Sequence, residues 1–146
     1  MHIELIRCDP SGVPVMPVGD LPEPIAANCR LSADLYRRVG YVEPWVSYVA
    51  VEGGVALGGG AFVGPPHEGC VEIAYFTLPP HEGRGIAGQI ATRLVAIARA
   101  SDPSIGLKAF TLMEENPSVR ILRRLGFVQT GTARDPDAGE VWEWRA

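Results

Sequence analysis

The spacing of hydrophobic residues changes several times along the chain, and each change marks the edge of an expected element. Alternating or continuous apolar segments predict strands, whereas apolar residues three or four positions apart predict helices. The expected strands cover residues 2–7, 46–51, 55–63, 70–78, 107–113, 127–132 and 140–144, and the expected helices cover 25–39, 86–100 and 116–125. This order predicts an α/β (mixed α+β) protein in which helices flank one mixed sheet.

The first expected helix is preceded by prolines at positions 14, 17, 22 and 24, which predict irregular chain up to its first residue. Its apolar residues recur at helical spacing and are Ile25, Leu31, Leu35 and Val39. Gly40 is a suitable residue to end it. We therefore expect an amphipathic helix that buries the side carrying these four residues.

The segment Cys70–Leu78 is apolar at almost every position, which predicts a central strand buried on both faces. Glu72 is the one charged residue within it. A buried carboxylate is costly unless it is paired or has a chemical role. Glu72 is therefore either a candidate general base or, at an edge, a solvated or ion-paired side chain.

Length and composition narrow the class of protein. With 146 residues the chain is expected to form one domain, and 47% hydrophobic residues supply a core. The net charge is −4 and no run of Lys or Arg occurs, which argues against nucleic-acid binding. Because no apolar stretch resembles a signal peptide or a membrane span, we expect a cytoplasmic protein without a membrane partner.

The thiol and imidazole side chains show no metal-binding pattern. The cysteines, Cys8, Cys29 and Cys70, are few and irregularly spaced, which favours reduced thiols over disulfides or a zinc site. The histidines lie far apart, and His81 lacks the second histidine of a zinc-protease motif. We therefore expect no metal.

The chemistry is concentrated in residues 79–88, which read Pro-Pro-His-Glu-Gly-Arg-Gly-Ile-Ala-Gly. This segment follows an expected buried strand and opens an expected helix. Backbone N–H groups at a helix start have no intrahelical partner, and the helix dipole is positive there. Glycines let such a backbone approach a ligand closely, so the segment predicts a phosphate or pyrophosphate site.

One interpretation of this segment is dinucleotide binding, because Gly83, Gly85 and Gly88 match G-x-G-x-x-G. Glu114 and Glu115 also end the next expected strand, where a ribose-binding acid would lie. In that fingerprint, however, the first glycine follows the strand almost at once, whereas residues 79–82 intervene here. Little chain remains for further βα units. A dinucleotide-dependent oxidoreductase therefore stays as an alternative.

Three segments resemble the GNAT N-acetyltransferase family. Residues 82–87 are similar to its cofactor loop Q/R-x-x-G-x-G/A and match it at Gly85 and Ala87. Residues 71–75 look like the strand before that loop in the subfamily acting on ribosomal-protein N-termini. Residues 115–127 resemble the family's Asn-x-x-Ser helix, which ends in Leu-Gly-Phe. The element order agrees with the family over essentially the whole chain.

The resemblance implies one GNAT domain over 1–146, a sheet that splays beside Cys70–Leu78, and acetyl-CoA as co-substrate. It implies transfer of an acetyl group to a primary amine, on a small molecule or a peptide, by direct attack. A homodimer is among the assemblies it allows. A catalytically silent acyl-CoA-binding module is the second alternative, because the helix over 116–126 lacks the tyrosine that many relatives use as general acid.

The resemblance also assigns residues. Glu72 would be the general base, and Ser118 or Tyr75 would assist the leaving thiol. Backbone groups of 75–77 would pair with the pantetheine arm. The cofactor-binding residues would be Tyr75, Phe76, Thr77, Glu82, Gly83, Arg84, Gly85, Ile86, Ala87 and Asn116.

Some assignments have alternatives. Glu82 stands where the family usually has Gln or Arg, and the spacing from Asn116 to Ser118 is one residue short. Ser118 could instead cap its helix. The charge of Arg84 could bind a phosphate or simply be solvated.

Overall fold

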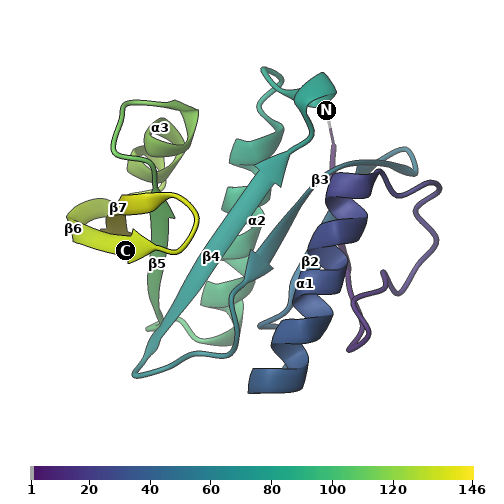
Figure 1. Ribbon diagram of the computed structural model, residues 1–146, viewed down its shortest axis with the longest axis horizontal. Coiled ribbons are helices and arrows are strands. Elements are labelled where there is room, and N and C mark those ends of the chain that lie inside the picture. The colour runs from purple at the N-terminus through teal and green to yellow at the C-terminus, as the bar shows by residue number, and fades with distance from the viewer. Residues whose placement is uncertain (1) are drawn as a thin grey trace.

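The computed structural model describes residues 2–146, whose strands form one seven-stranded sheet in the order β1-β2-β3-β4-β5-β7-β6 (Figure 1). The strands are β1 (Glu4–Arg7), β2 (Ser47–Glu52), β3 (Val55–Phe62), β4 (Cys70–Thr77), β5 (Gly106–Thr111), β6 (Val128–Asp135) and β7 (Gly139–Arg145). The helices are α1 (Glu23–Val39), α2 (Ile86–Ser101) and α3 (Pro117–Arg124), with a short 3₁₀ turn, η1 (Pro79–His81). The predicted mixed α/β sheet and its element order are confirmed.

The sheet opens between β4 and β5. These strands pair in parallel only from Cys70–Glu72 to Gly106–Lys108, and beyond that point they diverge. In the part of the chain that the structure describes, every other strand pair is antiparallel. A dinucleotide-binding fold needs an extended parallel sheet, so the oxidoreductase alternative does not agree with this topology.

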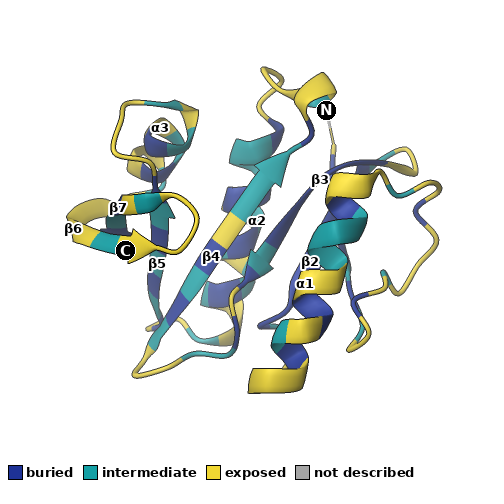
Figure 2. Ribbon diagram, in the orientation of Figure 1, coloured by how far each residue is buried: buried dark blue, intermediate teal, exposed yellow. Residues whose placement is uncertain are grey.

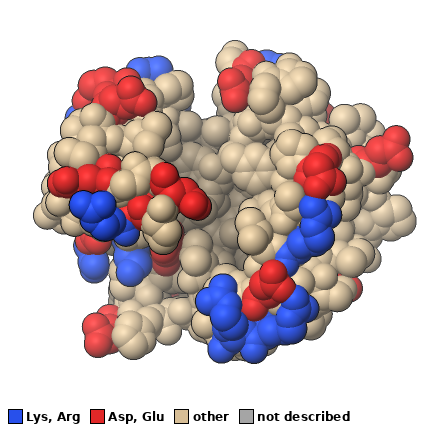
Figure 3. Space-filling model, viewed as in Figure 1, with Lys and Arg blue, Asp and Glu red and all other residues tan. Residues whose placement is uncertain are grey.

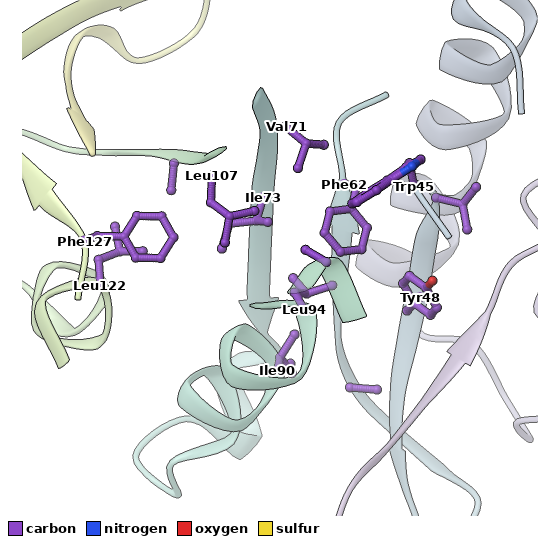
Figure 4. Close-up of a cluster of buried hydrophobic side chains, with 14 of the residues drawn as sticks. Trp45, Tyr48, Phe62, Val71, Ile73, Ile90, Leu94, Leu107, Leu122 and Phe127 are labelled. Carbon is purple, nitrogen blue, oxygen red and sulfur yellow. The ribbon is translucent and has the colours of Figure 1, made fainter. Parts of the chain in front are cut away.

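Helices α1 and α2 cover opposite faces of the sheet (Figure 1). On the α2 face, side chains of β2–β5 and β7 pack against α2 and α3 in the larger hydrophobic cluster. Figure 4 shows Ile73, Ile90, Leu94, Leu107 and Leu122 within this cluster. The second cluster joins Ile25 of α1 to the β1–β3 side of the sheet. None of the helices over 2–146 is both long enough and apolar enough to span a bilayer.

The buried side of α1 differs from the predicted one. Leu31 and Val39 are 66% and 45% exposed, so the predicted apolar side was wrong at these two positions, although Ile25 is buried as expected. The buried side chains are Ile25, Ser32, Ala33 and Tyr36, which also follow helical spacing. Ser32 tolerates burial because its hydroxyl forms a 2.6 Å hydrogen bond with that of Ser47. The helix also begins before Pro24, since proline is tolerated in a first turn.

The prediction that β4 is buried on both faces was also wrong. Val71 and Ile73 are buried on the α2 side, but Glu72 is half-buried and Ala74 is exposed on the other side (Figure 2). The cause is that α1 lies over β2 rather than over this part of β4 (Figure 1). Figure 3 shows a hollow down the middle of this face, between α1 and the β6–β7 hairpin. One face of the central strand is therefore accessible.

Candidate functional site

A cavity of about 1060 Å³ lies where β4 and β5 separate, between the end of β4, the loop before α2, and α3. Its lining includes most of the residues proposed to bind the cofactor. They are Tyr75, Thr77, Glu82, Gly83, Gly85, Ile86, Ala87 and Asn116, together with Ser118. Segments that are far apart in sequence are thus brought to one site by the divergence of the two strands.

The glycine loop has a backbone that few other residues could adopt. Gly83 and Gly85 have φ angles of 79° and 77°, in the left-handed region that favours glycine. A Cβ atom built on either would meet no atom within 4 Å, so open space lies over both. Gln89 N donates to Gly85 O at 3.2 Å, so the N–H groups of residues 86–88 precede the intrahelical ladder. The loop therefore offers unpaired donors beside open space, as a phosphate requires.

The free edge of β4 forms the second part of the site. Leu78 N donates to Leu57 O on β3, at 2.9 Å. Since backbone groups alternate between the two edges of a strand, Tyr75 and Thr77 direct theirs toward the gap beside β5. Phe76 directs its backbone toward β3, and its side chain packs with the α1-side cluster. Of the three residues predicted to line the arm, the structure brings two to the gap.

The Thr77 hydroxyl is buried without a hydrogen-bond partner anywhere in residues 2–146. An unpaired buried hydroxyl is costly, so we expect Thr77→Val to raise the free energy of unfolding by about 1 kcal/mol. We expect the affinity for CoA to stay within about twofold, because the Thr77 hydroxyl is buried and the pantetheine arm would pair with the backbone of this residue. Urea unfolding and isothermal titration measure the two quantities. If Thr77→Val instead destabilises the protein while Thr77→Ser is neutral, the hydroxyl makes a stabilising contact.

Tyr75 and Ser118 meet across the opening. The Tyr75 hydroxyl lies 3.1 Å from Ser118 Oγ and joins β4 to α3. Burial raises the pKa of Tyr75, and the Ser118 hydrogen bond opposes that shift. The helix cap is Asn116, whose Oδ1 accepts from Val119 N at 2.9 Å. The alternative in which Ser118 caps α3 is therefore wrong. The side-chain oxygen of Asn116 is engaged in this cap.

Glu72 lies at the point where β4 and β5 stop pairing, on the accessible face of the sheet. Burial raises the pKa of its carboxyl above the ordinary value. Lys108, its neighbour on β5, lowers the pKa, whereas Asp135 and Glu143 raise it. Glu72 is thus a carboxylate of increased basicity beside the opening, on the face opposite the Tyr75 side chain.

Arg84 does not reach the cavity. Its guanidinium donates to Glu52 Oε1 at 3.2 Å and lies 3.4 Å from His81 Nδ1. Among the residues that the structure describes, the side chain of Arg84 is not one of those that line the cavity. The ion pair with Glu52, at the end of β2, accounts for the direction of the side chain. The structure therefore does not support a direct contact between Arg84 and a ligand phosphate.

Three arginines that the sequence interpretation missed line the cavity instead: Arg93, Arg120 and Arg124. A signal for them was present. Arg93 is two helical turns after Ile86, and Arg120 and Arg124 are one turn apart, so each lies on a predictable helix side. Glu82 is the acidic side chain among the lining residues. Three positive charges and one negative charge leave the lining positively charged.

Comparisons with known proteins agree on a family. Residues 20–127, well over half of the chain, match the sequence model of the Acetyltransferase (GNAT) family. No curated protein sequence matches the chain.

Solved structures show the same fold. One is RimL, a ribosomal L7/L12 alpha-N-protein acetyltransferase in complex with coenzyme A, with TM-score 0.69 and 20% identity over 99% of this chain and 93% of that chain. Another is yncA from Salmonella typhimurium with its cofactor acetyl-CoA, with TM-score 0.66 and 17% identity over 100% and 94%. A third is an N-acetyltransferase from Staphylococcus aureus Mu50, with TM-score 0.68 and 16% identity over 100% and 98%. With its fold and its sequence match in agreement, the chain belongs to the GNAT family of acetyltransferases, which use acetyl-CoA.

Proposed function

We propose that this protein transfers the acetyl group of acetyl-CoA to a primary amine, on a small molecule or a peptide, in the cytoplasm. The observation that carries the proposal is the opening between β4 and β5 directly beside the glycine loop. Acetyl-CoA supplies the acetyl group as an activated thioester. The remaining chemistry depends on residues of this chain.

The cavity offers hydrogen-bonding groups that suit CoA. The N–H groups of residues 86–88 and the open space over Gly83 and Gly85 suit a pyrophosphate. The free backbone groups of Tyr75 and Thr77 suit the amides of a pantetheine arm, which would lie along β4 like an added strand.

Glu72 would accept a proton from the attacking amine, directly or through one water. Its carboxylate lies on the accessible face, so the amine would arrive through the hollow between α1 and the β6–β7 hairpin (Figure 3). The amine then attacks directly: in the described chain, the cavity hydroxyl of Ser118 hydrogen-bonds to Tyr75 rather than to a base. Positioning of the two reactants from opposite faces would supply much of the acceleration.

The Tyr75–Ser118 pair would hold the departing thiolate. We expect Tyr75→Phe and Ser118→Ala each to lower kcat by about tenfold or less, the scale of one hydrogen bond. A thiolate is a weak base near neutral pH, so little protonation is needed as it leaves. Steady-state kinetics at saturating acetyl-CoA measure the effect. A loss near a thousandfold in either folded variant would identify that residue as a true general acid.

The proposed activity is tested by measuring thiol release from acetyl-CoA across a panel of small amines, peptides and aminoglycosides. We expect release that depends on the amine, together with an acetylated product detected by mass. Binding of CoA without turnover on any acceptor would favour the silent acyl-CoA-binding module. A failure to bind CoA would contradict the assignment of the cavity.

A further inference from the structure

Two free thiols meet between the end of β1 and α1, outside the cavity. Cys8 directly follows β1 and is fully buried, whereas Cys29 lies in the first half of α1 and is half-buried. A hydrogen bond joins the two thiols, and both side chains pack in the second hydrophobic cluster. Neither is among the described residues that line the cavity assigned to CoA. We call Cys8 and Cys29 the cysteine pair.

The backbone on both sides holds the cysteine pair together. Cys8 N donates to Ser47 O on β2 at 2.9 Å, which anchors the end of β1. The chain then turns at once, because Gly12 N donates to Asp9 O at 2.8 Å. Gly12 lies directly against α1, since a Cβ built on it would be 2.2 Å from the Cys29 carbonyl oxygen. The loop after Cys8 and the turn of α1 that carries Cys29 are therefore in contact through backbone as well as through thiols.

The two thiols differ in acidity. The hydrogen bond from the Cys8 thiol lowers the pKa of Cys29 to about 7; burial opposes this shift, and the charge of Arg30 adds to it. The same hydrogen bond raises the pKa of Cys8, and burial raises it further. A free cysteine has a pKa of about 8.5, so Cys29 is the nucleophile of the pair. An acidic, partly exposed thiol beside a second thiol is the arrangement of redox-sensing cysteines.

We infer that the cysteine pair is a modification site, at which hydrogen peroxide forms a reversible disulfide. The Cys29 thiolate attacks one peroxide oxygen, the O–O bond breaks, and the departing hydroxide takes up a proton to leave as water. The Cys8 sulfur then attacks the sulfur of the resulting sulfenic acid. The S–O bond breaks, and the hydroxyl leaves as water with the proton of Cys8. Two thiols and one hydrogen peroxide thus give one disulfide and two molecules of water. A dithiol reductant reverses the reaction and is itself oxidised to a disulfide.

The disulfide would close a ring over residues 8–29 and tie the end of β1 to α1. Such a cross-link stabilises a protein mainly by restricting its unfolded chain. For a ring of this length we expect the melting temperature to rise by on the order of 5–10 °C relative to the reduced protein. The affinity for CoA should stay within about twofold, because neither thiol lines the cavity. The inference thus goes beyond the proposed function and does not depend on it.

The test follows the cross-link by mass spectrometry. Reduced protein is treated with a small excess of hydrogen peroxide, and its remaining thiols are alkylated after unfolding. The chain is then cleaved before aspartates, which cuts at Asp9 and Asp20, between the two cysteines. We expect two peptides joined through Cys8 and Cys29, with Cys70 alkylated. A dithiol reductant should return both thiols, and calorimetry of the two forms measures the change in melting temperature.

Cys70→Ala is the matched control, because Cys70 is also half-buried but lies at the start of β4, with Arg145 beside its sulfur. This variant should form the same cross-link. Cys8→Ala should leave Cys29 as a sulfenic acid that dimedone captures, since the resolving thiol is gone, whereas Cys29→Ala should give no sulfenic acid at Cys8. Alkylation of both Cys8 and Cys29 in the treated wild-type protein, or a disulfide that involves Cys70, would overturn the inference. Either result would leave the proposed function intact.

Discussion

Gly85→Val is expected to weaken CoA binding by about 100-fold or more, which is roughly 2.7 kcal/mol, while the chain remains folded. Gly85 is the N-cap of α2 and has a φ angle of 77°. A Cβ there meets no protein atom within 4 Å, so the valine side chain would occupy the space assigned to the pyrophosphate. The positive φ also disfavours valine, which would tilt the N–H groups that follow.

Gly139→Val separates this effect from backbone strain. Gly139, where β7 begins after its turn from β6, has a φ angle of 79°, and a Cβ there also meets no atom within 4 Å. The Gly139→Val variant should therefore lose about 1–3 kcal/mol of stability, an amount comparable to the loss in Gly85→Val, yet bind CoA as the wild-type protein does. Circular dichroism and isothermal titration measure both properties. Wild-type CoA affinity in folded Gly85→Val would refute the assignment of the loop.

Glu72→Gln is expected to lower kcat by about 10²–10⁴-fold, the usual effect of losing a general base. Affinity for CoA should change little, because Glu72 faces the side of the sheet away from the cavity. The defect should shrink at high pH, where the amine loses its proton unaided. In the wild-type protein, kcat should fall as pH drops through the raised pKa of Glu72. Glu140→Gln, which replaces an exposed acid on β7, is the control and should retain kcat.

The raised pKa also predicts the sign of a stability change. A carboxyl whose pKa is higher in the folded than in the unfolded state binds more protons when folded, so stability falls as pH rises through that interval. Glu72→Gln removes this loss. The variant should therefore match or exceed the wild-type protein in thermal stability at neutral pH and lose the advantage in acid.

A Glu72→Gln variant with wild-type kcat at neutral pH would show that Glu72 is not the base.

The fold was predictable where the pattern was local. The order of the elements along the chain and the hairpin turn at residues 53–54 follow from periodicity and glycines alone. The buried side of α1 did not, because Ser32 is accommodated by a hydroxyl of Ser47 on another element. The open face of β4 depends on where α1 packs, which a single strand's composition does not encode.

The candidate site, too, was predictable only where its residues are close in sequence. The glycine loop was predictable because its strand, loop and helix are consecutive in sequence. The contact between Tyr75 and Ser118 joins residues 43 positions apart and exists only because the sheet opens between them. Arg93 of α2 and Arg120 of α3 likewise line one cavity only because two helices face it, and the ion pair that turns Arg84 away involves Glu52 on a distant strand.

Direct transfer of the acetyl group is tested most simply by a single-turnover experiment. The protein is loaded with acetyl-CoA and mixed with an amine that the panel shows to be an acceptor, and both product and protein are followed by mass spectrometry. We predict that the acetylated amine appears at the rate at which CoA thiol is released, while the mass of the protein does not change. An acetylated protein that forms and then decays, or bound acetyl-CoA that persists without any acetylated amine, would contradict the account.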